Sequence, residues 1–299
     1  NFVIPYLKCQ SLSETAERVS RLNRDTKAAY EKNVQALDAI AMTAYGVGAH
    51  LDLATASGSV PPQSFPIADQ LQNCSNLFAP QLLSWLVGCI FARWDIRYAT
   101  GEKTTPELPD SFAKLPVCPP GQLQNPDGLS ARSEEVPITY PVRIPWDGII
   151  VDDPNHPKDI ELRIREVIEV VWCGKEEGPT SESIEHEACE LLGVKTLRDY
   201  LRKPAGFFSD HLKRYSKSRR QAPIYWQLSA GNGSYSAWLY YHRFTEDTIY
   251  RVLHDFVEPR IQQAERETFE LESQVTHSDE VAKRLQETQS LLQDLRIFK

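Results

Sequence analysis

The chain has 299 residues and a net charge of −8, from 33 lysines and arginines against 41 aspartates and glutamates. Its 41% hydrophobic and 25% charged residues are typical of a globular protein with one large domain or two ordinary ones. The most apolar run, 82–92, is shorter than the ~20 residues that a membrane span requires, so we expect no membrane partner. The acidic balance excludes a protein coated in positive charge, but it permits one local basic groove.

The six cysteines are scattered without a Cys-x-x-Cys pair. This pattern favours a reducing, cytoplasmic setting over a disulfide framework or a zinc site. The chain begins with Asn1 and has no recognisable signal peptide, so we expect it to be a piece of a longer protein.

The first part of the chain, 1–100, is predicted to be a helical region. Ser11 and Glu14 have the spacing of a capping box, which marks a helix start. Apolar residues then recur at helical spacing, so one or two helices are expected between Ser11 and Tyr45. The apolar stripe consists of Val34, Leu37, Ile40, Ala41 and Ala44.

A further helix is predicted over 79–95, where apolar residues cover more than half of the circumference and therefore require burial. Arg93 and Asp95 at its end are expected to form a structural salt bridge. The following segment, 101–145, holds nine of the 20 prolines and few periodic apolar positions. Such a composition is typical of a long extended connection, and we place the main domain boundary there.

The region 146–258 is predicted to combine helices with one small antiparallel element. Apolar and polar residues alternate in 223–229 and again in 235–243, on either side of a glycine-rich turn, which predicts a β-hairpin. Helical patterns precede these strands, and they cover 157–172, 181–192 and 195–201.

Residues 259–299 are rich in Glu, Gln, Leu and Arg and contain two helical patterns, 260–274 and 278–298. We expect them to form a helical hairpin that serves as a spacer. The whole chain is therefore predicted to be α+β and predominantly helical, with a small antiparallel β element at about 223–243 and this C-terminal helical hairpin.

A local excess of positive charge precedes the predicted β-hairpin. Residues 198–220 contain eight basic residues against two acidic ones, a net charge of +6 (8 − 2). Five of the eight could contact the phosphates of a nucleic acid, which fix position more than they specify sequence; they are Lys213, Arg214, Lys217, Arg219 and Arg220. If that nucleic acid is duplex DNA, the candidates for contacts with base edges are Arg219, Arg220, Tyr225, Gln227 and Arg243. A merely solvated basic loop is the alternative interpretation.

No catalytic signature is recognisable. The chain has no glycine-rich nucleotide loop, no Gly-x-Ser-x-Gly motif and no His-Glu-x-x-His motif. Asp152 and Asp153 precede a proline, which favours an acidic turn over a metal site. We therefore expect no catalysis, no metal and no cofactor in this chain, while an independent enzyme with an unrecognised site is a minor alternative.

Four segments are similar in sequence to one known family. The most specific runs from Phe207 to Arg243 and contains FFSDHLKRYSKSRRQAPIYW and SYSAWLYYHR. The others are Leu83–Asp95, Leu115–Gly121 and Gly148–Pro154. Together they resemble the C-terminal part of large bacterial adenine-N6 DNA methyltransferases, which include type II (IIG-like) restriction-modification enzymes and methyltransferases of BREX phage-defence systems. The resemblance spans most of residues 30–260.

The resemblance implies that the chain is a target-recognition fragment that follows the catalytic domain. The family's Asn-Pro-Pro-Tyr-type motif and its glycine-rich motif are absent. Methyl transfer, base flipping and S-adenosylmethionine would therefore belong to the parent enzyme. The expected partners are duplex DNA and the catalytic domain of the same polypeptide. The alternative is a structural or protein-interaction module, in which 213–220 docks onto the catalytic domain or a partner subunit.

Overall fold

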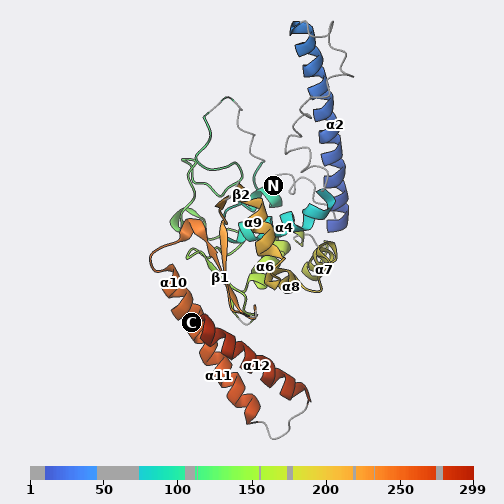
Figure 1. Cartoon of the computed structure of the whole chain (residues 1–299). Coiled ribbons are helices and arrows are strands. Elements are labelled where there is room, and N and C mark those ends of the chain that lie inside the picture. Colours follow the sequence, from blue (N-terminus) through green and yellow to red (C-terminus); the bar gives the residue numbers. More distant parts are fainter. Residues whose placement is uncertain are drawn as a thin grey trace.

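Helices dominate the computed structural model of the chain, and a small three-stranded antiparallel sheet lies among them (Figure 1). Two helical segments, one near each end of the chain, extend from the packed centre in opposite directions. The predicted class, α+β and predominantly helical, is therefore confirmed. The residues that the structure describes are 11–45, 74–104, 112, 114–154, 156–173, 178–217, 220–231, 233–273 and 279–299.

Helix α4 (Cys74–Ile90) is the central element of the helical core. Its apolar residues face most directions, as predicted for a buried helix, and α2, α6, α7 and α9 pack around it. Leu83 and Leu86 are fully buried. Gly88 permits a close contact, because a methyl group there would lie 2.2 Å from the Trp94 ring. Among the described residues, no helix has the length and apolarity needed to cross a bilayer.

Helix α2 (Leu12–Tyr45) begins on the core and then projects from it (Figure 1). The Glu14 N–H donates to the Ser11 hydroxyl over 3.1 Å, so the serine half of the predicted capping box is present. Farther along, Leu37 and Ile40 of the predicted apolar stripe are 65% and 64% exposed. Within the part of the chain that the structure describes, this end of α2 is therefore not packed into the core.

The proline-rich segment 101–145 is mostly irregular, as its composition predicts. Its one helical element among the described residues is the short 3₁₀-helix η2 (Ser133–Glu135). Leu123 and Val142 are nevertheless buried, so the segment packs against the rest of the protein. The domain boundary that we placed there stays a prediction.

The sheet consists of β1 (Ile149–Val151), β5 (Ser236–Tyr240) and β4 (Tyr225–Ser229), in that order. All its pairs are antiparallel, and β4 and β5 form the predicted β-hairpin. The central strand is buried on both faces. Trp238 packs into the helical core, whereas Leu239 faces a second apolar cluster built with the C-terminal helices. The period of two in a strand accounts for this division.

Short helices connect the first strand to the β-hairpin, and they are α6 (Ile160–Trp172), α7 (Ser181–Leu192), α8 (Leu197–Arg202) and α9 (Phe207–Arg214). Asp159, Thr180 and Thr196 cap the first three by accepting a backbone N–H. Gly206 lies directly before α9, where a methyl group would come within 1.9 Å of the Tyr200 carbonyl oxygen. Glycine therefore allows α9 to begin against α8.

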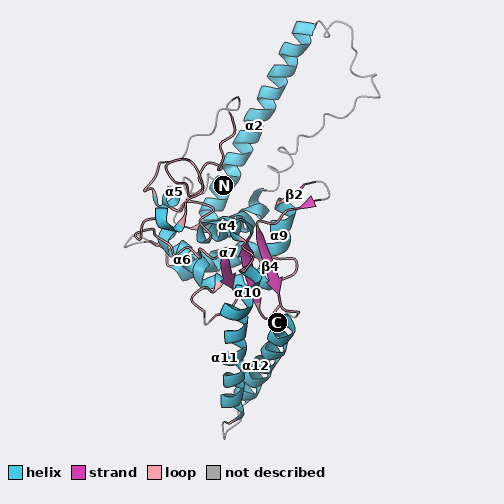
Figure 2. Cartoon of the chain, turned by 90° about the vertical axis from the view of Figure 1, so that its left-hand side faces the viewer, coloured by secondary structure: helices cyan, strands magenta, loops and turns pink. Residues whose placement is uncertain are grey.

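The C-terminal helices form the predicted hairpin (Figure 2). Pro259 follows a π-helical turn, and its ring accounts for the widened turn because it supplies no N–H and collides with the carbonyl four residues earlier. Leu295 is fully buried in the second apolar cluster, so the hairpin is attached to the sheet. The elements are α10 (Thr248–Arg251), the π-helix η4 (Val252–Val257), α11 (Glu258–Glu272) and α12 (Asp279–Phe298).

Candidate nucleic-acid interface

The predicted phosphate-binding residues lie at the end of α9 and on a two-stranded ribbon that follows it. Strand β2 (Ser216–Lys217) pairs with β3 (Arg220–Gln221) in an antiparallel register. We call residues 213–221 the basic hairpin. Figure 2 shows β2 at the periphery of the molecule, beyond α9 and apart from the three-stranded sheet.

The structure describes most of the five predicted phosphate contacts. Lys213 and Arg220 are exposed, and Arg214 is half-buried. Lys213 forms one ion pair within α9 over 3.3 Å, but a pair this exposed holds its side chain only weakly. Arg219 and the side chain of Lys217 lie outside the described residues.

A buried histidine attaches the basic hairpin to the sheet. His211 Nε2 accepts hydrogen bonds from the backbone N–H groups of Ile224 (2.9 Å) and Tyr225 (3.1 Å). Burial, together with the charges of Arg93 and Arg214, lowers the pKa of His211 from 6.5 to about 3. The ring is therefore neutral near pH 7, as its role as an acceptor requires.

A cluster of buried aromatic rings lies beside His211, at the base of the basic hairpin. Tyr225 is fully buried, its ring stacks on Phe91 with centroids 5.4 Å apart, and Tyr240 lies 5.8 Å away. A side chain buried in this way packs within the core next to His211 and presents no atom to a DNA groove. The structure therefore places Tyr225 in the core, away from any base edge.

Of the other described candidates for base contacts, Arg220 is exposed, whereas Gln227 and Arg243 are bound to main-chain carbonyl groups. Gln227 Nε2 donates to the Leu201 carbonyl oxygen over 3.3 Å. Arg243 Nη1 donates to the Pro145 carbonyl oxygen over 2.9 Å, and its guanidinium carbon lies 4.5 Å from the centre of the Trp146 ring. In this structure both side chains stabilise the surroundings of the sheet.

Two arginines of the basic window are neutralised inside the protein. Arg198 contacts three carboxylates, and its Nη2 lies 2.9 Å from Asp159 and 2.6 Å from Glu161. Arg202 Nη2 donates to Asp152 over 3.1 Å. The segment 198–220 has eight basic residues, and six (8 − 2) remain when Arg198 and Arg202 are set aside. Five of these six belong to the basic hairpin.

The expected salt bridge between Arg93 and Asp95 is wrong. Asp95 instead pairs with Arg97 over 2.8 Å and with Lys103 over 2.9 Å. Burial raises the pKa of Asp95, but the hydrogen bonds and charges of these two cations outweigh it and keep the pKa below its usual value. Arg93 Nη1 donates to the Tyr215 hydroxyl over 2.8 Å, so Arg93 lies at the base of the basic hairpin.

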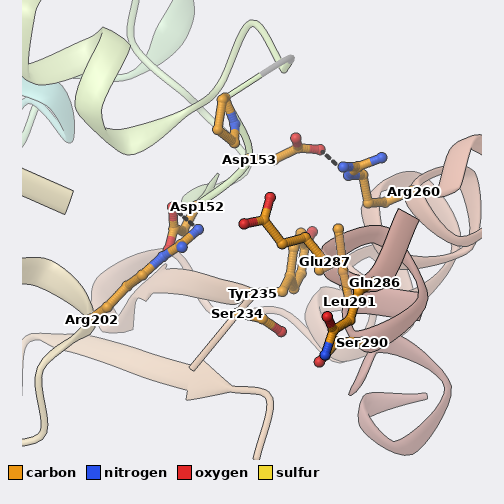
Figure 3. A pocket seen from close by; sticks show the side chains of 11 residues that line it. Asp152, Asp153, Arg202, Ser234, Tyr235, Arg260, Gln286, Glu287, Ser290 and Leu291 are labelled. Atoms are coloured by element: carbon orange, nitrogen blue, oxygen red, sulfur yellow. Dashed lines mark hydrogen bonds and ion pairs between the residues drawn. The ribbon is translucent and has the colours of Figure 1, made fainter. Parts of the chain in front are cut away.

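A cavity of about 550 Å³ lies between the core and the C-terminal helices (Figure 3). Its wall contains Asp152 with Arg202 and Asp153 with Arg260, the latter pair 3.4 Å apart. Asp152 and Asp153 each face a guanidinium, and Glu287 is the third carboxylate of the wall. Among the residues that the structure describes, no group of three or more His, Cys, Asp or Glu side chains could hold a metal ion.

No protein-family model matches this chain, and no curated protein matches it significantly. A proposal for its function therefore rests on the residues of the chain itself and on the geometry of the basic hairpin.

Proposed function

We propose that this chain is the DNA-recognition fragment of an adenine-N6 DNA methyltransferase and that it binds duplex DNA through the basic hairpin. The observation that carries the proposal is the concentration of accessible cations on one small element, including Lys213, Arg214 and Arg220, in an otherwise acidic chain. Phosphate contacts need only such a local excess. Methyl transfer from S-adenosylmethionine would belong to the catalytic domain of the longer enzyme.

The attachment of the basic hairpin favours this function over a merely solvated loop. A solvated loop needs no fixed position, whereas His211 binds two backbone N–H groups at the base of the hairpin. The Tyr215 hydroxyl adds a contact to Arg93 on the core. An element that is already held in place loses less conformational entropy when it binds a partner.

The affinity of the chain for a labelled duplex, measured as a function of salt, tests the proposal. Each phosphate contact contributes about 0.9 to the slope of log K against log [salt]. Replacing all five cations of the basic hairpin by alanine should therefore weaken binding and, if each contacts a phosphate, lower the slope by about 4.5. The variant carries the substitutions of Lys213, Arg214, Lys217, Arg219 and Arg220.

A charge-matched control removes five exposed cations from the C-terminal helices instead: Arg266, Lys283, Arg284, Arg296 and Lys299. Both variants lose five positive charges, so a general effect of net charge would weaken binding equally in the two. We expect the control to keep most of the wild-type slope. Equal losses in both variants, or no binding by the wild type, would contradict DNA recognition by the basic hairpin.

A protein-interaction module is the second candidate function. Large apolar side chains are exposed around β4 and α10, and such side chains are typical of contact surfaces; they are Trp226, Tyr241, Phe244, Ile249 and Tyr250. If the chain docks onto the catalytic domain through these apolar side chains and not through 213–220, the five-alanine variant of the longer enzyme should methylate DNA as the wild type does. That result would replace DNA recognition by docking.

A further inference from the structure

Arg93 is a half-buried cation held by aromatic groups. Its guanidinium carbon lies 5.0 Å from the centre of the Trp94 ring and 5.1 Å from that of Tyr215, whose hydroxyl accepts a hydrogen bond from Nη1. Within the described part of the chain, no carboxylate forms an ion pair with Arg93. Arg97, four residues later, has Asp95 as its counter-ion.

The groups around Arg93 supply no negative charge at neutral pH. Burial and the charge of Arg93 lower the pKa values of His211 and His242, so both rings are neutral. Tyr225 lies nearby, and burial raises its pKa far above neutral pH. A partly desolvated charge without a counter-ion is unfavourable. An anion that reaches this guanidinium would therefore supply the missing counter-charge. The rings of Trp94 and Tyr215 already orient the guanidinium for such a contact.

We propose that Arg93 binds a phosphate group of the DNA backbone at the base of the basic hairpin; this inference rests on the proposed function. A guanidinium has five N–H donors in a planar fork. The Tyr215 hydroxyl and the neighbouring Tyr225 hydroxyl take up two of them, which leaves three donors for phosphate oxygens. Because the two rings fix the guanidinium, its binding to phosphate costs little side-chain entropy.

The position of Arg93 favours a phosphate of a duplex over a free phosphate ion. A single guanidinium supplies only one charge, so its affinity for a small anion is low. Arg214 ends α9, and the next residue, Tyr215, contacts Arg93. Arg93 is therefore adjacent to the cations of the basic hairpin, and a polyanion can engage both groups at once.

Two substitutions of similar length separate the charge of Arg93 from its packing. R93K keeps the charge, R93M removes it, and both lose the planar fork, so damage to packing is common to the two. We expect R93M to have a salt slope smaller than that of R93K by about 0.9, the value for one phosphate. The exposed Arg284 is the control residue, and R284K and R284M should have equal slopes.

The outcomes distinguish this inference from the proposed function. If R93K and R93M have the same slope while the five-alanine variant loses binding, Arg93 contacts no phosphate but DNA recognition stands. If the wild type binds no duplex, both proposals are wrong.

The Nε–H resonance of Arg93 gives a second measurement, which uses the unmutated chain and so does not depend on whether a variant folds. It should shift when duplex is added, and an unchanged resonance in the bound state would overturn the inference.

Discussion

At the scale of single residues, the protonation state of His211 decides whether the basic hairpin stays attached. Its Nε2 accepts two backbone hydrogen bonds, and a protonated ring could accept neither. The ring is buried, and its pKa is about 3 in the folded chain against 6.5 as the ordinary value. Below pH 6.5 the unfolded chain therefore binds a proton that the folded chain excludes.

This difference predicts a pH-dependent stability. As the pH falls from 6.5 toward 3, His211 should reduce the free energy of unfolding by about 1.4 kcal/mol per pH unit. Urea unfolding at pH 7.5 and pH 5.5 measures the change. An H211Q variant has no titrating ring, so its stability should change less between the two pH values. An equal change in stability for H211Q and the wild type would show that folding does not lower the pKa of His211.

Gly206 is a second residue whose identity is set by a tertiary contact. A methyl group there would lie 1.9 Å from the Tyr200 carbonyl oxygen, and a main-chain atom cannot move aside cheaply. We expect G206A to lower the free energy of unfolding by about 1–3 kcal/mol, as overpacked positions do. Gly231 provides the control, because a methyl group there meets nothing within 4 Å. Chemical denaturation that finds the two variants equally stable would contradict this explanation.

At the scale of elements, the sheet joins two apolar clusters. Its one face packs into the helical core around α4, and its other face contacts the π-helix and α12. The C-terminal hairpin was expected to act as a spacer, yet Leu295 inserts fully into the second cluster. The hairpin therefore contributes to the stability of the sheet that carries the basic hairpin.

Leu295 and Ile297 test this contribution, because they are two residues apart on α12 and differ in burial. Leu295 is fully buried, whereas Ile297 is 71% exposed. L295A should lower the free energy of unfolding by about 2–5 kcal/mol, from lost burial and the cavity left behind. I297A should change it by less than about 0.5 kcal/mol. A small effect of L295A in thermal or urea unfolding would mean that the hairpin is only a spacer.

At the scale of the whole molecule, the distribution of charge separates structural from accessible cations. Arg198 and Arg202 surround the carboxylate of Asp152, whose side chain has no exposed surface. Both arginines belong to the same basic window as the basic hairpin. The fold therefore uses two cations of the basic segment 198–220 in an internal ion cluster, and the cations of the basic hairpin remain for a partner.

The two arginines of this cluster should differ in their importance for stability. Arg198 is 15% exposed and contacts three carboxylates, so R198M leaves buried charge without compensation and should lower the free energy of unfolding by about 3–5 kcal/mol. Arg202 is 34% exposed, and Arg198 still compensates Asp152 in R202M. Its loss should therefore cost about 1 kcal/mol. Urea unfolding of both variants measures the difference, and similar losses would contradict the ranking.

Much of the fold follows from local patterns in the sequence. Alternation around the glycine-rich turn predicts the β4–β5 hairpin, and the helical period predicts α4, α6 and the C-terminal hairpin. These patterns suffice because a strand or helix repeats its buried positions at a fixed interval. The contacts of polar side chains follow no fixed interval along the sequence, so a local pattern does not predict them. Arg93 contacts Tyr215 across 122 positions, and Arg198 contacts Asp152 across 46.

The sequence by itself determined the class of the protein, the order of its main elements and the site of its densest positive charge. Only the tertiary structure decided which charges remain accessible, because neutralisation depends on which carboxylates the fold brings within contact. It buried Tyr225, bound Gln227 and Arg243 to carbonyl groups, and enclosed Arg198 among carboxylates. It also placed Arg93, for which the sequence predicts a salt bridge with Asp95, at the base of the basic hairpin. The reason is that folding brings Arg93 Nη1 within 2.8 Å of the hydroxyl of Tyr215, which lies 122 positions later in the chain.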